Sequence, residues 1–404
     1  MILSMAWRNI WRNKMRSLVI MLSVTIGLFA GVAVQALYKG MMTARIKTVI
    51  EEEAGHLQIH AVHFKNDYEP KYIIANGDDV LKEISKMPGI KLAIPRSITT
   101  GMLATATGSA GVQINGIIPD QEYQATQLKN KIIEGLPFDS LKRNEVMVGK
   151  KLAVKMKLKK GSKLVLTFTD SAGNMVSGAF RVNAVYQSAN APLDERNVYV
   201  EKKDLNELLG IGSSFHEIAI ILDNDKITET TRKELKSRFP LYKIESWKEI
   251  APETDLMVNT VNQLSYILMT IIMFALAFGI INTMLMAVLE RTREIGMMVA
   301  LGTAKRKIFL LILTETGLLT LAGVPWGMGI GWLAIDHFNK NGLDLSGMGR
   351  EMMSSFGYTP LIYPEFPFDK LAGVLIIVCA TAILSGLFPA IKALRLRPVE
   401  ALKQ

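Results

Sequence analysis

Four stretches of this 404-residue chain carry almost no charge, and each is long enough to cross a lipid bilayer. They are Ser17–Tyr38, Leu256–Leu289, Ile308–Ile335 and Leu371–Ile391. A bilayer core of about 30 Å needs roughly 20 apolar residues at about 1.5 Å of helical rise each. Because lipid offers the backbone no hydrogen-bond partners, spanning segments must be helices or closed barrels. The sequence therefore predicts an α-helical membrane protein with four transmembrane helices.

Basic residues are concentrated in three short segments, which lie before the first helix, between the second and third, and after the fourth. These segments hold 13 basic residues against three acids, whereas the loop between helices three and four holds three basic residues against five acids. Short basic segments stay cytoplasmic, so both termini are expected inside and the segment 39–260 outside. That segment has 31 basic and 28 acidic residues, so the net charge of +10 does not indicate a nucleic-acid partner.

These boundaries divide the chain into nine parts. They are an amphipathic cytoplasmic segment (1–16), four transmembrane helices (17–38, 261–289, 308–335 and 370–391), a large external domain (39–260), a cytoplasmic helix (290–307), a short external loop (336–369) and a cytoplasmic tail (392–404). An apolar run this long, preceded by 16 residues, is more typical of an uncleaved anchor than of a signal peptide. No proline precedes Gly55 and no glycine occurs between residues 41 and 54, so the first helix is expected to end near Glu51–Glu53.

The external domain has an α+β pattern. Strand, helix and strand patterns follow one another at 56–62, 79–87 and 90–98, and again at 217–222, 228–239 and 241–244. We interpret these as two β-α-β halves around a β-rich insertion near 146–200. Lys150–Lys163 carries seven lysines between alternating apolar residues, which we interpret as a solvated sheet edge.

The sequence contains no pattern typical of catalysis. It lacks the phosphate-binding motif Gly-x-x-x-x-Gly-Lys-Ser/Thr, and it has neither His-Glu-x-x-His nor Gly-x-Ser-x-Gly. The single cysteine, Cys379, lies in the fourth apolar stretch, so the external domain has no cysteine for a disulfide or a zinc site. His56, His60 and His63 are not placed to ligate a metal as a set, and we predict no metal site. A non-catalytic subunit that takes its energy from a partner is expected.

The segment Glu290–Gly302 is a candidate docking element. Ile295, Met298 and Val299 form one apolar stripe at helical spacing. Because a short helix outside the membrane has no core of its own, we expect this stripe to enter a groove on another protein; the alternative is packing on the inner leaflet. Glu315, the only ionisable group in an apolar stretch, is expected to pair with a basic residue of the cytoplasmic face, with a substrate contact as the alternative.

Glycines at 323, 327 and 331, and at 27 and 31, recur every four residues and let helices approach closely. We interpret these faces as packing within one bundle. The alternative is association with a second permease copy.

Three segments carry a family resemblance. Glu290-Arg-Thr-Arg-Glu-Ile-Gly-x3-Ala-Leu-Gly302, the closing Pro389-Ala-x6-Leu-Arg-Pro-Val-Glu-Ala-Leu402 and the opening Trp7-Arg-Asn-Ile-Trp-Arg-Asn-Lys-x-Arg16 resemble the FtsX/MacB-type ABC transporter permeases. Gly55-His-Leu-Gln-Ile-His60 and Ser246-Trp-Lys-Glu249 are similar to the lipoprotein-releasing (LolC/LolE-type) subgroup. The resemblance implies a multi-pass protein of the bacterial inner membrane that carries a MacB-like periplasmic core domain.

The resemblance also implies that the loop between helices two and three is a coupling helix on a separate ATPase dimer, which binds ATP and Mg²⁺; this chain is expected to bind no cofactor. MacB carries its ATPase ahead of the first helix, whereas only 16 residues precede that helix here. The implied coupling residues are Glu290, Arg291, Arg293, Glu294, Ile295, Gly296 and Leu301.

The function implied is nucleotide-driven movement of the periplasmic domain that releases lipoproteins to a periplasmic carrier, with a second permease copy or homologue as partner. The residues expected to contact acyl chains are Met41, Met42, Leu256, Met257, Val261 and Leu264. Two alternatives remain open, namely MacB-like export of peptides or small molecules and FtsX-like signalling to cell-wall hydrolases.

Overall fold

The computed structural model describes residues 2–139, 142–348, 353, 357–358 and 361–394. The described chain divides into two compact units. The helical unit comprises the residues up to Met42, Val258–Asp344 and the residues from Leu361 onward, and the α+β unit comprises Thr43–Met257 and the described part of 345–360. Residues 395–404 of the predicted tail lie outside the described residues.

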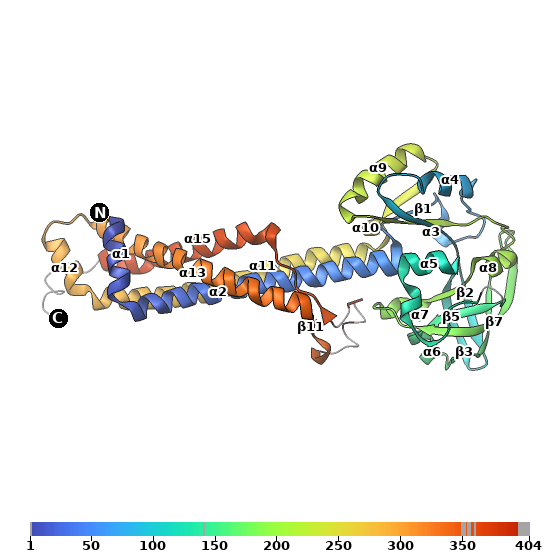
Figure 1. Ribbon diagram of the computed structural model, residues 1–404, viewed down its shortest axis with the longest axis horizontal. Coiled ribbons are helices and arrows are strands. Elements are labelled where there is room, and N and C mark those ends of the chain that lie inside the picture. The colour runs from blue at the N-terminus through green and yellow to red at the C-terminus, as the bar shows by residue number, and fades with distance from the viewer. Residues whose placement is uncertain (1, 140–141, 349–352, 354–356, 359–360, 395–404) are drawn as a thin grey trace. The chain divides into compact units, whose positions relative to one another are not determined.

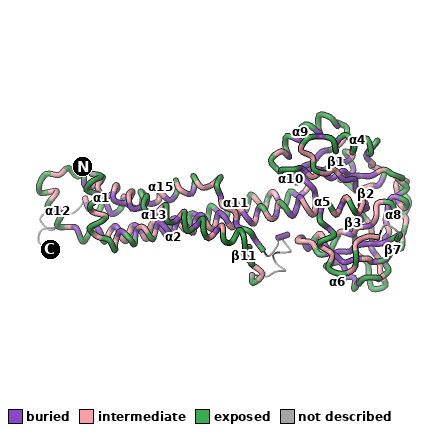
Figure 2. The backbone as a smooth tube through the Cα atoms, viewed as in Figure 1, coloured by how far each residue is buried: buried purple, intermediate pink, exposed green. Residues whose placement is uncertain are grey.

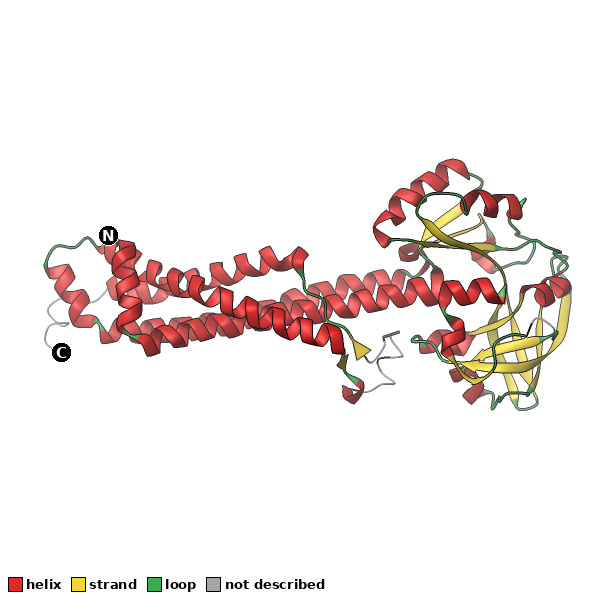
Figure 3. Cartoon of the chain, in the orientation of Figure 1, coloured by secondary structure: helices red, strands yellow, loops and turns green. Residues whose placement is uncertain are grey.

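Six helices contribute to the helical unit (Figures 1 and 3). They are α1 (Ile2–Arg12), α2 (Lys14–Thr48), α11 (Pro252–Glu290), α12 (Thr292–Ala300), α13 (Lys305–Asn341) and α15 (Phe368–Leu394). Four of them, α2, α11, α13 and α15, are long and apolar enough to cross a membrane, as the sequence predicts. A short strand pair, β11 (Leu343–Asp344) and β12 (Leu361–Ile362), joins α13 to α15.

The long helices pack through one apolar core and leave apolar side chains on the outside. The core includes Leu28 of α2, Leu276 of α11, Leu319 of α13 and Val378 of α15. On the outer surface of α11, Phe278 is 70% exposed, and green exposed positions run along all four helices in Figure 2. Exposed aromatic surface of this kind is stable only against lipid or another apolar partner.

Glycines of α13 bring this helix against α2. A Cβ on Gly323 would lie 2.9 Å from the carbonyl oxygen of Met21, and a Cβ on Gly327 would lie 2.9 Å from that of Thr25. The Thr25 hydroxyl also donates a hydrogen bond of 3.2 Å to the carbonyl oxygen of Gly323. The predicted packing within one bundle is therefore confirmed for these two glycines.

The α+β unit contains a ten-stranded sheet in the order β10-β1-β9-β2-β3-β8-β5-β7-β4, with β6 paired to β2 and β7. The strands are β1 (Leu57–Ala61), β2 (Ile90–Thr105), β3 (Gly108–Ile117), β4 (Ile132–Gly135), β5 (Glu145–Gly149), β6 (Lys163–Thr169), β7 (Met175–Tyr186), β8 (Asn197–Glu201), β9 (Glu217–Leu222) and β10 (Tyr242–Ser246). The helices are α3 (Phe64–Asp67), α4 (Gly77–Ile84), α5 (Pro119–Thr126), α6 (Lys150–Lys155), α7 (Ala191–Arg196), α8 (Lys202–Leu209), α9 (Thr228–Arg238) and α10 (Trp247–Ile250).

Two separate cores divide this unit into two lobes. The first lobe contains β10, β1, β9, α4 and α9 around a core that includes Ile59 and Phe215. The second lobe contains β3 to β8 around a core that includes Leu166 and Phe180. Strand β2 belongs to both, because its residues 90–96 pair with β9 and its residues 101–104 pair with β6.

The predicted β-α-β halves are found in the first lobe, where β1, α4 and β2 pack with β9, α9 and β10. The β-rich part was predicted too narrowly, because it begins with β3 at Gly108 rather than near residue 146. The lysine-rich segment was predicted wrongly as a sheet edge. It begins with helix α6, in which Leu152 and Ala153 are buried, and Met156 and Leu158 are buried after it. Alternation over so few residues does not distinguish a strand from one helical turn whose apolar side lies at i and i+4.

The glycine contacts generate a prediction. Replacing Gly327 with isoleucine should lower the melting temperature of the detergent-purified chain, because the new side chain would overlap the backbone of α2 and overpacking costs about 1–3 kcal/mol or more. Gly329→Ile is the matched control, since a Cβ there meets no heavy atom within 4 Å. Equal melting temperatures for the two variants would contradict the packing.

Candidate functional site

Six charged side chains join α1, α2, α11 and α13 to the region of α12, and we call them the α12 cluster. They are Arg12, Arg16, Glu290, Arg291, Glu294 and Glu315. Arg12 Nη2 donates to both carboxylate oxygens of Glu294, at 2.7 and 2.6 Å, and Arg16 pairs with Glu290. Because three arginines meet three carboxylates, the cluster is electrically neutral.

The Arg291–Glu315 pair is the buried member of the cluster. Arg291 Nη1 lies 3.2 Å from each oxygen of Glu315, and the two side chains are 10% and 7% exposed. Arg291 also donates to the carbonyl oxygen of Asn9 in α1 at 3.4 Å. Glu315 therefore pairs with a basic residue, as predicted, and that residue is Arg291. Removing one member of a buried pair leaves an uncompensated charge, which costs about 3–5 kcal/mol.

The apolar stripe of α12 packs on the chain itself. Ile295 is 6% exposed and belongs to the core of the helical unit, and Met298 and Val299 are packed against that core. The prediction that the stripe has no core of its own is therefore wrong. Arg291 and Gly296 are buried as well, so these two residues and Ile295 are not free to contact a partner in this conformation.

The opposite face of α12 is open. Arg293 and Glu294 are exposed, as are Met297 at 52% and Leu301 at 86%. Residues 293, 297 and 301 are four apart and therefore share one helical face. Four of the predicted coupling residues, Glu290, Arg293, Glu294 and Leu301, are thus exposed, and Met297 was missed because it lies outside the predicted stripe.

The predicted acyl-contact residues are divided between the two units. Met41, Met42, Val261 and Leu264 belong to the helical unit, and Leu256 and Met257 to the α+β unit. Met42 is buried, whereas Leu256 and Leu264 are 66% and 46% exposed. Sequence reasoning missed an apolar groove of about 460 Å³ between α11 and α15, lined by Tyr266, Met273, Phe274, Ile377 and Leu384 among others.

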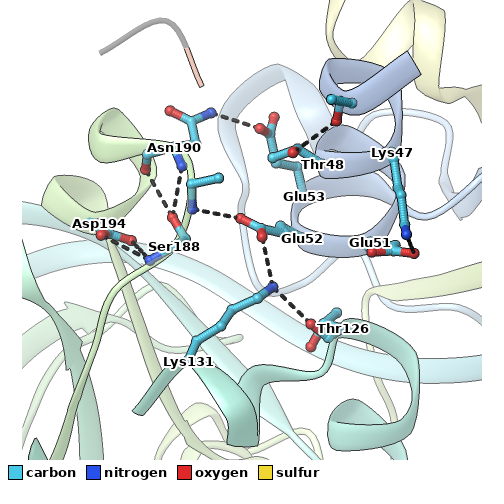
Figure 4. Close-up of polar contacts among 12 residues, drawn as sticks. Lys47, Thr48, Glu51, Glu52, Glu53, Thr126, Lys131, Ser188, Asn190 and Asp194 are labelled. Carbon is cyan, nitrogen blue, oxygen red and sulfur yellow. Dashed lines mark hydrogen bonds and ion pairs between the residues drawn. The ribbon is translucent and has the colours of Figure 1, made fainter. Parts of the chain in front are cut away.

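A second set of polar contacts surrounds the end of the first long helix. After Thr48 the helix continues as a π-helix, η1 (Val49–Ala54), which places three consecutive glutamates at 51–53. We call the contacts of Glu52 and Glu53 the η1 clamp (Figure 4). Glu52 Oε1 lies 3.1 Å from Lys131 Nζ, and Glu52 Oε2 accepts a hydrogen bond of 3.1 Å from the backbone amide of Ala189.

Glu53 completes the clamp on both sides. It accepts a hydrogen bond of 2.7 Å from Asn190 Nδ2 and pairs with Arg45 at 2.8 Å, while Arg45 donates to the Thr254 hydroxyl at 3.0 Å. Lys131, Ala189 and Asn190 belong to the second lobe, so η1 is held to that lobe by charge and hydrogen bonds. The apolar side of η1 instead packs on Trp247 of α10 and on Ala251. This side consists of Val49, Ile50 and Ala54.

Chain continuity connects η1 to the first lobe. Gly55, with φ of +72°, turns the chain directly into β1, and the amide of His56 donates to the carbonyl oxygen of Ile220 in β9. Positive φ favours glycine, which explains Gly55 at this turn. The η1 helix therefore touches both lobes at once.

A buried carboxyl group stands beside the clamp. Burial raises the pKa of Asp194 to about 6, against the lowering effect of hydrogen bonds from Ser188, and the charge of Glu52 raises it further. The backbone amide of Ser188 lies 3.1 Å from each oxygen of Asp194. The protonation state of Asp194 therefore affects its hydrogen bonds with Ser188, and the next residue, Ala189, contacts Glu52.

The histidines after the first long helix have separate structural partners. His56 Nδ1 accepts from the amide of Leu222 at 3.2 Å, and His60 Nε2 lies 2.7 Å from Glu245. His63 packs its ring against Tyr72. Among the residues that the structure describes, no group of three or more His, Cys, Asp or Glu side chains is arranged to hold a metal ion.

The clamp generates a double-mutant prediction. In a thermal-unfolding cycle on the full chain, Glu52→Ala and Lys131→Ala should couple by about 1–3 kcal/mol, because the pair is largely shielded from water and Ala189 also binds the carboxylate. The Lys47–Glu51 pair is the control; its side chains are 67% and 40% exposed, and its coupling should stay below about 0.5 kcal/mol. Equal coupling energies in the two cycles would show that the Glu52–Lys131 pair stabilises the fold no more than an exposed ion pair does.

Asp194 generates a prediction for pH. Its raised pKa means that the folded state binds a proton more tightly than the unfolded state, so its contribution to stability grows as the pH falls from above 6 toward 4. The stability of the wild type relative to Asp194→Asn should therefore increase by about 2 kcal/mol between pH 7.5 and 4. A pH-independent difference in thermal unfolding would show that the carboxyl group titrates normally.

Two family profiles match the chain. The family described as "MacB-like periplasmic core domain" matches residues 17–238, and the family described as "FtsX-like permease C-terminal" matches residues 266–398. The chain is similar to an uncharacterized ABC transporter permease of Methanocaldococcus jannaschii, with 24% identity over 230 residues that make up 55% of each protein.

Two longer relatives cover nearly the whole chain. It is 24% identical to the macrolide export ATP-binding/permease protein MacB of Salmonella choleraesuis, over 99% of this chain and 60% of that protein. It is 25% identical to the pyoverdine export ATP-binding/permease protein PvdT of Pseudomonas savastanoi, over 98% and 58%. The chain thus spans about three fifths of the length of these relatives.

A comparison of structures finds the periplasmic region of MacB from Actinobacillus actinomycetemcomitans, with 16% identity and a TM-score of 0.36 over 51% of this chain and 94% of that one. These matches do not distinguish the lipoprotein-releasing subgroup. The two family profiles cover most of the sequence, including the helices that flank α12 and both lobes. The chain therefore belongs to the ABC-transporter permeases that combine a MacB-like periplasmic core domain with an FtsX-like C-terminal region.

Proposed function

We propose that this chain is a non-catalytic permease subunit that transmits movement from a separate ATPase to the α+β unit, and that its cargo is a lipoprotein released to a periplasmic carrier. The observation that carries the proposal is that α2 and α11 each contribute residues to both units. A displacement of either helix is therefore passed directly to residues of the α+β unit, beginning with η1.

Charge supports the orientation. The basic segments around α1 and α12 belong on the cytoplasmic side of an inner membrane, which leaves the α+β unit on the periplasmic side with both termini inside. The α12 cluster then lies at the cytoplasmic ends of the helices. Its ion pairs hold α12 and the preceding Arg291 to α1 and α13, and a third pair joins α2 to the end of α11.

The open face of α12 is the proposed contact for the ATPase. Arg293, Glu294, Met297 and Leu301 are exposed there, and an exposed apolar pair beside charges is typical of a protein interface. The buried residues of this segment would transmit a displacement of the open face to the other helices of the helical unit. They are Arg291, Ile295 and Gly296. ATP and Mg²⁺ belong to the partner, which is proposed to act as a dimer beneath two permease copies or homologues.

Lipoprotein release rests on the resemblance of the α+β unit and on the apolar surface of α11. Leu264 and Phe274 are 46% and 63% exposed on this helix, which suits acyl chains, and extracting each buried CH₂ group costs about 0.8 kcal/mol. The names of the two exporting relatives favour a second candidate, export of a small molecule or peptide. FtsX-like signalling is the remaining alternative.

The decisive experiment is reconstitution of the chain with its ATPase in liposomes that contain a labelled lipoprotein. ATP-dependent transfer of the label to a soluble acceptor protein supports lipoprotein release. ATP hydrolysis without transfer, together with ATP-dependent uptake of a dye or peptide, would assign export instead.

The α12 face generates a further prediction. Leu301→Asp should lower permease-stimulated ATP hydrolysis at least tenfold without changing membrane insertion or the melting temperature, because Leu301 is 86% exposed and contributes little to the chain's own packing. Leu241→Asp in the α+β unit, at an 82% exposed position, is the matched control and should leave hydrolysis unchanged. Full stimulation by the Leu301 variant would exclude this face as the docking surface.

A further inference from the structure

A large cleft lies between the two lobes of the α+β unit. Its volume is about 640 Å³, within the range of about 300–1,000 Å³ that is typical of ligand pockets. Strands β2 and β3 form one wall, α3 and α7 approach from the two lobes, and η1 lies at one end. Its lining includes Gln58, Gly111, Gln113, Asn115, Arg196 and Glu253.

The lining combines three chemistries. Ile98, Val112 and Leu193 supply apolar surface. The side chains of Gln58, Gln113 and Asn115 supply amide groups, and charged residues of both signs are also present. Gln58 is bonded to Lys65 and to the carbonyl oxygen of Ala54, and the amide groups of Gln113 and Asn115 bond each other. A purely apolar ligand such as an acyl chain would therefore leave the Oε1 atom of Gln113 and the exposed charges without partners, which is costly. The lining instead matches a ligand that carries apolar, amide and charged groups together.

Gly111 indicates how close a ligand can come. It lies inside β3, opposite Met102 of β2, and a Cβ built there meets no heavy atom within 4 Å. Gly101, also at this wall, differs, because a Cβ there would lie 2.4 Å from the carbonyl oxygen of Thr167. Packing in the chain therefore explains Gly101 but not Gly111. A glycine inside a strand weakens it, and often marks close approach by a ligand or another backbone.

Some of the charged side chains that line the cleft are paired within the chain, and others are open to a ligand. Arg96 is buried and satisfied by the chain, since it donates to Glu122 at 2.7 and 3.0 Å and lies 3.5 Å from Glu217. Arg196 and Glu253 are exposed at the cleft, and within the described part of the chain neither takes part in an ion pair. One free cation and one free anion are therefore presented to a ligand.

We propose that this cleft binds an extended polypeptide segment of the transported cargo. A peptide backbone can approach the side of β3 that Gly111 leaves bare and donate a hydrogen bond to Gln113 Oε1, whose Nε2 is bonded to Asn115. Side chains or termini of opposite charge can pair with Arg196 and Glu253. The inference deepens the proposed function, because it assigns the polypeptide part of the cargo to the α+β unit, apart from any acyl contact in the membrane.

The cleft is also continuous with the η1 clamp. Glu52 and Glu53 line it while they hold Lys131, Asn190 and the amide of Ala189 (Figure 4). A bound segment would therefore contact the same helix that connects α2 to the lobes. Since coupling between two sites is reciprocal, a displacement of η1 that weakens peptide binding must itself be opposed by the bound peptide.

The test uses the full chain in lipid nanodiscs with no ATPase present. The probe is a pool of fluorescein-labelled hexapeptides, acetylated and amidated, and binding is followed by fluorescence anisotropy. Saturable binding is expected for the wild type, with at least a tenfold loss of affinity in Gly111→Phe, whose ring would fill the cleft. Ser109→Phe, two residues earlier on the same exposed side of β3 and outside the cleft lining, should bind as the wild type does.

A second readout controls for folding. In a Cys379→Ala background, Gly111→Cys supplies the only thiol of the chain, and the peptide pool should slow its reaction with a maleimide at least threefold. No saturable binding, equal binding by the two phenylalanine variants at equal melting temperatures, or an unprotected thiol would each overturn the inference. Displacement of the peptides by a diacyl phospholipid would overturn it in favour of a lipid site. Failure of lipoprotein release with intact peptide binding would reject the proposed cargo and leave the cleft assignment standing.

Discussion

Two adjacent carboxylates at the end of the first long helix attach that helix to the second lobe of the α+β unit. Glu52 and Glu53 bind three positions of the second lobe, while the chain beyond them runs straight into the first. The π-helical turn keeps both carboxylates beside each other at the junction. Because these groups are largely shielded from water, losing either contact leaves a charge or amide unsatisfied, which favours a single orientation of η1.

The opposite end of the helices follows a similar rule. The α12 helix has two faces with different partners, because its apolar stripe completes the core of the bundle, and Glu294 and the preceding Arg291 form ion pairs with α1 and α13. Only the remaining face is open to another protein. A docking element fixed in this way transmits displacement instead of absorbing it, which suits a chain whose proposed task is mechanical.

The sequence predicts the long helices well, because runs of apolar residues without charge have few other stable environments than lipid. It also predicts the β-α-β halves and a basic partner for Glu315. The sequence does not predict the positions of residues whose partners are set by tertiary packing. Ile295 has the pattern of a docking stripe, yet it enters the chain's own core, and the partners of Glu52 lie about 80 and 140 residues away, beyond any local pattern. The acyl-contact residues were chosen by predicted depth, which does not tell which side chains share a surface.

Strand β2 has a consequence for how the two lobes can move. It is one uninterrupted run of sixteen residues that is hydrogen-bonded into both lobes, and an extended strand can neither lengthen nor break without losing its ladder. The lobes therefore cannot slide apart along it. A change in the angle between the lobes would therefore twist or bend β2 and change the width of the space between them. Release of a bound molecule would accordingly be a torsional event.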